Sequence, residues 1–190
     1  MRVRGAWLFV WPCLLACAPS SVRVPRPGSG QSPSADVLPI EEACVPTGPE
    51  RCFDARDDNC NGIIDEGCGV KTGVVQFIIA WDDPNADVDL LVTDPKGELV
   101  EVGRPSLAGL IKERDCPGKQ QECHGENFEN VYLDGERPKN GSYRVKIRLE
   151  RLGDEEEVRV TLGARVGPKT YASRIVLRER EESKELRFSL

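Results

Sequence analysis

The sequence predicts a mainly β protein, an antiparallel β-sandwich that follows a small cysteine-rich segment and a disordered N-terminal tether. Apolar and polar residues alternate with period two in residues 142–149 and 158–166, as expected for strands that bury one face. Turn-forming residues separate such runs, for example at 94–97 and 138–141. Several short strands punctuated in this way are typical of a sandwich.

Other strands follow from the same reasoning. Residues 74–81 form a continuous apolar run, which favours a central strand, and residues 170–178 and 185–190 fit two further strands. Residues 106–114 are the one stretch whose pattern favours a helix. We therefore expect a β-sandwich domain over residues 73–190, with Trp81 in its core.

The charge of the chain excludes one class of partner. The 190 residues include 26 Lys and Arg against 32 Asp and Glu, which gives a formal net charge of −6. Binding to a phosphate backbone requires clustered cations that release counterions. Nucleic acid is therefore not an expected ligand.

Residues 1–16 have the form of an export signal. Arg2 and Arg4 precede an apolar run over 6–16, which is too short to span a bilayer. The run ends in Leu-Leu-Ala before Cys17, which resembles the lipobox of bacterial lipoproteins. That resemblance implies cleavage before Cys17, a lipid on its thiol and, with Ala18 following, an outer-membrane lipoprotein of the cell envelope. An ordinary secretory signal is the alternative interpretation.

The next segment, residues 17–40, is rich in Pro, Ser and Gly. It cannot bury enough apolar area to offset the entropy of ordering it, so we expect an extended tether. Its role would be to hold the folded part away from the membrane.

Six cysteines remain in the exported part. They are Cys44, Cys52, Cys60, Cys68, Cys116 and Cys123. In an oxidising compartment we expect three disulfides, because a segment as small as 41–69 cannot otherwise stabilise itself. The sequence leaves three pairings open among the first four cysteines, and a local Cys116–Cys123 bridge is the simplest account of the other two.

The cysteine-rich segment also contains the spacing of an oxygen-lined calcium loop. Such a loop turns alternate side chains toward one centre, and a glycine (here Gly62) lets the chain bend beneath the ion. The expected ligands are Asp57, Asn59, Asn61, the carbonyl of Ile63, and Asp65, with Asp54, Asp58 and Glu66 as auxiliary carboxylates. The loop lacks the last glutamate of an EF-hand, so we expect weak, structural binding of Ca²⁺. A disulfide-stapled turn in which the Asp and Asn side chains cap their own backbone is the alternative.

Residues 50–66, ERCFDARDDNCNGIIDE, resemble the metal-binding repeat of secreted myxobacterial proteins and MopE-type surface proteins, which reads roughly E-x-C-x-D-G-x-D-N-D-C-D-G-x-x-D. Ala55 stands where that family usually has glycine. The paired cysteines of the repeat imply a Cys52–Cys60 bridge, which leaves Cys44–Cys68 as an outer bridge.

Residues 80–97 (AWDDPNADVDLLVTDPKG) resemble the signature of the YfaP-like secreted bacterial β-sandwich, and residues 129–133 and 140–147 match its later pieces. The resemblance implies a sandwich related to pre-peptidase C-terminal domains, with no established catalytic residues. Asp87 and Asp89 share one face of this strand and could gather with Asp82 and Asp83 around a second calcium. A solvated acidic edge is the alternative that we favour.

Nothing in the sequence favours an enzyme. His124 is the only histidine, and no nucleophile motif accompanies it. We therefore expect a non-enzymatic lipoprotein that contacts another envelope or extracellular protein, or a glycan. A carbohydrate-binding module would require exposed aromatic residues, and Tyr132, Tyr143 and Tyr171 alternate with the expected core.

Overall fold

The computed structural model describes residue 40 and residues 44–118, 122–135 and 137–190, which all lie in one compact unit, Asp36–Leu190. The expected signal peptide (1–16), the expected lipid attachment at Cys17 and the tether up to residue 39 lie outside the described residues. Within the described part of the chain, no helix has the length and apolar character needed to cross a membrane.

The described residues form eight strands, and the predicted mainly β fold is confirmed. In chain order they are β1 (Val75–Trp81), β2 (Asp87–Thr93), β3 (Leu110–Arg114), β4 (Phe128–Leu133), β5 (Ser142–Arg151), β6 (Val158–Val166), β7 (Lys169–Leu177) and β8 (Ser183–Ser189).

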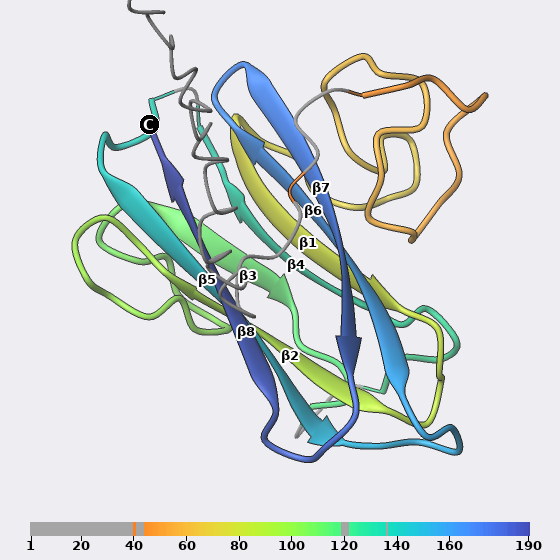
Figure 1. Ribbon diagram of the computed structural model, residues 1–190. Coiled ribbons are helices and arrows are strands. Elements are labelled where there is room, and N and C mark those ends of the chain that lie inside the picture. Colours follow the sequence, from red (N-terminus) through yellow and green to blue (C-terminus); the bar gives the residue numbers. More distant parts are fainter. Residues whose placement is uncertain (1–39, 41–43, 119–121, 136) are drawn as a thin grey trace, which may run out of the picture. The chain divides into compact units, whose positions relative to one another are not determined.

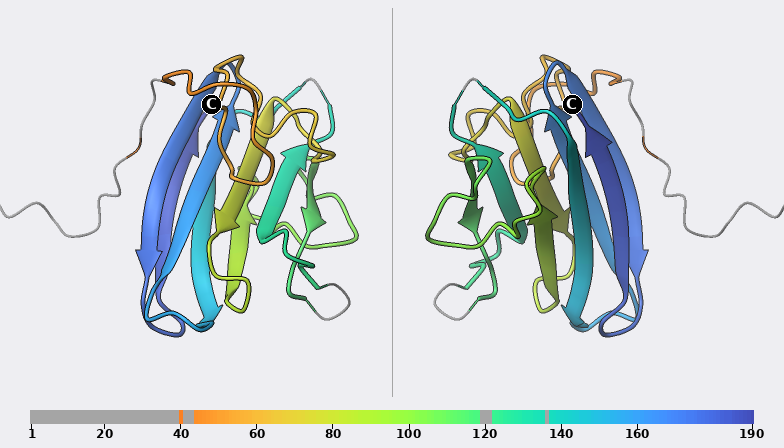
Figure 2. Two further views of the ribbon diagram at one scale, coloured as in Figure 1. Left: turned by 90° about the vertical axis from the view of Figure 1, so that its right-hand side faces the viewer. Right: turned by 90° about the vertical axis from the view of Figure 1, so that its left-hand side faces the viewer.

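The strands make two antiparallel sheets. One has the order β3-β4-β1-β6-β7 and the other the order β2-β5-β8. Figures 1 and 2 show them as two facing layers, with the cysteine-rich segment (orange to yellow) beside the five-stranded sheet. The tight connection between β6 and β7 depends on Gly167, whose φ of +63° is readily available to glycine.

The core lies between the sheets and follows the predicted alternation. In β5 the inward residues Tyr143, Val145, Ile147 and Leu149 are buried, while their neighbours are half-buried or exposed. Phe77 of β1 crosses the interface, with its ring centroid 5.9 Å from that of Tyr143 and 5.4 Å from that of Phe188. Trp81 is buried in this core, as predicted.

One local prediction is wrong. Residues 106–114 contain no helix but a turn followed by β3. The Ser106 hydroxyl accepts hydrogen bonds from the N–H groups of Ala108 and Leu110, and Gly109 adopts a φ of +88°. Pairing of β3 with β4 then buries Leu110, so tertiary contacts override a weak helical preference.

Candidate metal site

The cysteine-rich segment packs against the outer face of the five-stranded sheet. Ala55, Ile64 and Val70 of the segment form a small apolar cluster with sheet residues Ile78, Ala80 and Phe128. This cover explains why all seven residues of β1 are buried, because one face of the strand meets the sandwich core and the other meets the segment.

A glycine allows the close approach. A Cβ at Gly163 of β6 would lie 2.3 Å from the carbonyl oxygen of Ala55, a distance that no side chain tolerates. Ala55 itself has a φ of +59°, in the left-handed region that non-glycine residues rarely adopt. The segment is therefore fitted to this sheet by backbone contact as well as by apolar burial.

The disulfides of the segment differ from the pairing that the resemblance implied. Cys44 is bonded to Cys60 and Cys52 to Cys68, so the two bridges interleave rather than nest. In the observed turns, Cys60 has its Cα 5.6 Å from that of Cys44, within the range a disulfide requires. The implied Cys52–Cys60 and Cys44–Cys68 bridges are therefore wrong.

The third bridge, Cys116–Cys123, is confirmed. It closes the connection between β3 and β4, and both cysteines are buried at the edge of the core.

Asp57 organises the loop that was predicted to bind calcium. Its carboxylate accepts hydrogen bonds from the N–H groups of Asn61 and Gly62, at 3.0 and 2.8 Å. The side-chain oxygen of Asn61 accepts the N–H of Ile63 at 2.9 Å, and Gly62 bends the chain with a φ of +87°. The side-chain oxygen of Asn59 also accepts the N–H of Asn61, at 3.0 Å. The first, third and fifth predicted positions therefore line one tight turn.

Glu66 joins this turn. Its Oε1 accepts hydrogen bonds from the side-chain amides of Asn59, at 2.5 Å, and of Asn61. Its other oxygen, Oε2, is buried and has no hydrogen-bond partner. Side chains 59, 61 and 66 thus converge. Glu66, predicted only as an auxiliary outside the two-residue spacing, therefore brings a carboxylate to the turn.

Asp65 lies apart from that convergence. It is fully buried, and its two carboxylate oxygens accept the N–H groups of Asp54 and Ala55 at 3.3 and 3.1 Å. Burial raises the pKa of Asp65 to about 7. The Asp65 side chain holds the backbone that carries Ala55 onto the sheet. Ile63, whose carbonyl was the predicted ligand, donates its N–H to the side chain of Asn61.

The residues predicted for a second calcium are divided between two surfaces. Asp82 pairs with Arg159 of β6, its carboxylate 3.3 Å from the guanidinium. Asp87 and Asp89 share one face of β2, as predicted, and Asp89 pairs with Arg148 of β5 at 2.9 Å. Each of Asp82 and Asp89 therefore has an arginine where the prediction would place an ion.

A different acidic group lies nearby. Among the described residues, one set of three carboxylates is close enough to hold a metal ion, namely Asp89, Asp115 and Glu129, with oxygens within 4.8 Å of one another. Two of the three are occupied by a lysine, because Nζ of Lys112 lies 2.6 Å from Asp115 and 3.0 Å from Glu129. The cation that neutralises these carboxylates is therefore the ammonium group of Lys112.

The charges of this group are tightly coupled. Burial raises the pKa of Glu129 well above its ordinary value. Burial alone would lower the pKa of Lys112, but the carboxylates of Glu129 and Asp115 outweigh that effect and raise it. The same ammonium group lowers the pKa of Asp115 against the effect of burial.

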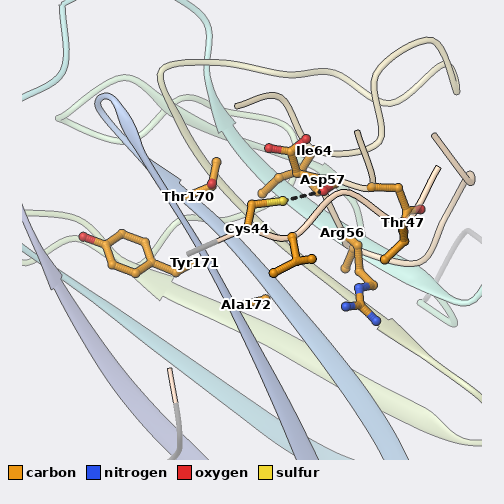
Figure 3. Close-up of a pocket in the computed structure, with 11 residues that line it drawn as sticks. Cys44, Thr47, Arg56, Asp57, Ile64, Thr170, Tyr171 and Ala172 are labelled. Atoms are coloured by element: carbon orange, nitrogen blue, oxygen red, sulfur yellow. Dashed lines mark hydrogen bonds between the residues drawn. The ribbon is translucent and has the colours of Figure 1, made fainter. Parts of the chain in front are cut away.

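A small pocket of about 130 Å³ lies between the cysteine-rich segment and β7 (Figure 3). Its lining includes Cys44, Asp57 and Tyr171, and Sγ of Cys44 is 3.0 Å from the carbonyl oxygen of Asp57. The volume is well below the roughly 300–1,000 Å³ of typical small-molecule sites. We therefore assign it no substrate.

Comparisons with protein-family models, curated proteins and solved structures find no match for this chain. The two sheets and the three bridges define the class of protein, a disulfide-stapled β-sandwich.

Proposed function

We propose that this chain is a non-enzymatic lipoprotein of the cell envelope, in which a calcium-stabilised β-sandwich acts as an interaction or adhesion module. The observation that carries the proposal is the turn around Asp57. Its carboxylate holds two backbone N–H groups while Asn59, Asn61 and Glu66 converge beside it.

The donor set of this turn suits calcium. Carboxylate and amide oxygens are the ligands that Ca²⁺ takes, and a buried, unpartnered Oε2 on Glu66 is an oxygen that a cation would satisfy. We propose Asp57, Asn59, Asn61 and Glu66 as side-chain ligands, with the Ile63 carbonyl. Asp65 then supports the turn from behind. With two carboxylates, we expect a Kd of about 10⁻⁴–10⁻³ M, as in extracellular modules.

The ion would have a structural role. The turn belongs to the segment that covers the outer face of the five-stranded sheet, so fixing the turn also fixes the cover. The segment follows the tether directly in the sequence, and it would give the lipid-anchored end of the chain a rigid attachment to the sandwich.

The proposed location in the cell envelope is supported by the sequence of residues 1–17 and by the disulfides, which persist in oxidising compartments. The partner we propose is another envelope or extracellular protein. We favour a protein over a glycan as the partner, because every aromatic ring among the described residues is buried or half-buried.

Calcium binding is tested by calorimetry and by thermal unfolding of the full chain, with magnesium as the comparison. At ten times the Kd, binding should add about 1.4 kcal/mol to the free energy of unfolding, and the melting temperature should rise by a few degrees. Asp57→Asn should abolish the rise in melting temperature. Asp82→Asn, which removes a carboxylate that pairs with Arg159 outside the turn, should keep it. No heat and no shift at millimolar calcium would contradict the proposal.

The lipid anchor has a separate test. Incorporation of a palmitate label and recovery in the membrane fraction should both disappear in a Cys17→Ser variant. An unlabelled wild-type chain would contradict the anchor and leave the calcium proposal standing.

A further inference from the structure

Lys112 is a buried amine with no part in the proposed calcium turn. Its side chain is 6% exposed, although it sits on β3, an edge strand of the five-stranded sheet. Lys112 pairs in register with Val131, a core residue, and the register shifts between Lys112 and Arg114. Leu110, two residues earlier on β3, is also a core residue, so strand alternation turns Lys112 into the space between the sheets before the register shifts.

Two carboxyl groups meet this amine. Nζ of Lys112 lies 2.6 Å from Oδ1 of Asp115 and 3.0 Å from Oε2 of Glu129. The Glu129 side chain is 1% exposed and Asp115 is 38% exposed, so one carboxyl group is dry and the other reaches water. The three groups supply what a condensation requires. Lys112 is the amine, Glu129 the desolvated acyl group and Asp115 the hydrated base.

The geometry points to a covalent bond, and we propose that Lys112 and Glu129 join through an intramolecular isopeptide bond. Asp115 removes a proton from the ammonium group of Lys112, and the neutral amine attacks Cδ of Glu129. The C–N bond forms as one carboxyl oxygen leaves, and that oxygen departs as water with two protons taken from the former ammonium group. One ammonium and one carboxylate thus become one amide and one water, and no oxidant or activated donor is consumed.

The same carboxylates raise the pKa of Lys112, so the amine needs a base in contact with it, and Asp115 supplies one. Other features of the surroundings favour the reaction. Burial raises the pKa of the Glu129 carboxyl, which favours transfer of the ammonium proton of Lys112 to this carboxylate, and the resulting acid is the better acyl donor. The N–H of Leu90 donates to Oε2 of Glu129 at 2.7 Å, where it would stabilise the negative charge of the tetrahedral intermediate. Fixed contact also replaces an encounter in solution, which can raise the effective concentration of reactants to roughly 10⁵ M or more.

The bond would also remove a buried ion pair, whose desolvation is costly. It would join edge strand β3 to its neighbour β4 by a side-chain bond in addition to backbone pairing. Since Leu90 belongs to β2 of the other sheet, the amide would lie at the point where the two sheets meet. The sandwich of an exported protein would thereby resist opening at this edge.

Peptide mapping of the reduced full-length protein tests the proposal, and it is independent of how the N-terminus is processed. We expect no tryptic cleavage after Lys112, and a branched peptide that joins the segment containing Lys112 to the segment containing Glu129. Its mass should be that of the two segments less one water molecule. A wild-type map with free Lys112, or with Lys112 joined to Asp115, would overturn the proposal.

Three variants sharpen the assignment. Lys112→Arg keeps the positive charge but removes the nucleophile, so no branched peptide should form. Glu129→Gln should lose ammonia instead of water and yield a product identical to the wild-type product, which a purely structural role of residue 129 would not produce. Asp115→Asn should slow the formation of the bond by roughly 10²-fold or more, the usual contribution of a positioned base. Formation at the wild-type rate in Asp115→Asn would contradict the role of Asp115.

Discussion

The ring of Phe53, in the cysteine-rich segment, stacks on the ring of Phe128 in β4, with centroids 5.0 Å apart and planes inclined by 12°. The guanidinium carbon of Arg114 lies 4.3 Å from the centre of the same Phe128 ring. Arg114 in turn donates to the carbonyl oxygens of Cys123 and Glu126. The Phe128 ring therefore connects the segment to the disulfide loop between β3 and β4.

Phe53→Ala should loosen the segment from the sheet. We expect a loss of about 1–2 kcal/mol in the free energy of unfolding, because ring stacking alone contributes roughly 0.5–1.5 kcal/mol. Denaturant unfolding measures the loss, and limited proteolysis should show earlier cleavage within residues 44–70. Leu107→Ala removes a side chain that is 74% exposed and should change neither readout. Equal effects of the two variants would contradict the docking of the segment through Phe53.

Gly163→Ala tests the backbone contact on the same face. The added methyl group would lie 2.3 Å from the Ala55 carbonyl oxygen, so the segment must move away from β6. We expect a destabilisation of about 1–3 kcal/mol, the usual cost of overpacking. Arg165→Ala, two residues further along the same strand face, provides the control and should stay within about 0.5 kcal/mol of wild type. A Gly163→Ala protein as stable as wild type would mean that the segment does not rest on this strand.

The sequence could predict the sandwich because its signals are local. Alternation in residues 142–149 and 158–166 specifies strands and assigns their faces, and the observed burial follows it. The continuous apolar run of β1 predicts burial on both faces of this strand. The sandwich core covers only one face, so Ile78 and Ala80 on the other face need a second element to cover them. That cover is the cysteine-rich segment.

The disulfide pairing and the side-chain contacts of the candidate sites depend on strand register and on turns, which the sequence pattern does not specify. Nothing in the spacing of four cysteines at intervals of eight distinguishes interleaved from nested bridges, and only the turns around Asp57 and Asp65 decide it. Lys112 and Glu129 meet because they are diagonal neighbours on the inward face of the paired strands β3 and β4, a register that no motif encodes. Glu66 replaces Asp65 beside Asn59 because Asp65 is used to hold the backbone.

The interleaved disulfides predict a graded response to their removal. A Cys52→Ala/Cys68→Ala variant opens a loop with a separation of 16 residues and should lose about 3 kcal/mol. A Cys116→Ala/Cys123→Ala variant opens a loop with a separation of 7 and should lose less, because the entropy of the unfolded chain depends on loop length. Denaturant unfolding measures both losses, and non-reducing peptide mapping checks the pairing directly. Recovery of a Cys52–Cys60 peptide would contradict the structure.

The hydrogen bonds of the Asp83 carboxylate make the stability of the fold depend on pH in the acid range. Burial opposes ionisation of its carboxyl group, but hydrogen bonds from the N–H groups of Asn85, Glu155 and Asp154 outweigh burial and hold the pKa of Asp83 below its ordinary value. A carboxyl group whose pKa is lower in the folded than in the unfolded state stabilises the fold above the unfolded pKa. That stability is lost as the pH falls below about 4 and passes through the folded pKa.

We therefore expect the free energy of unfolding to fall as the pH drops below about 4, and Asp83→Asn to make that fall shallower. The variant should also be less stable than wild type at pH 7, because an amide offers one acceptor oxygen where the carboxylate offers two. Asp134→Asn, which replaces an exposed carboxylate, is the control and should leave the acid dependence unchanged. Urea unfolding at a series of pH values measures the slope. An unaltered slope in Asp83→Asn would show that the carboxylate that joins the β1–β2 connection to the β5–β6 connection does not control the response to acid.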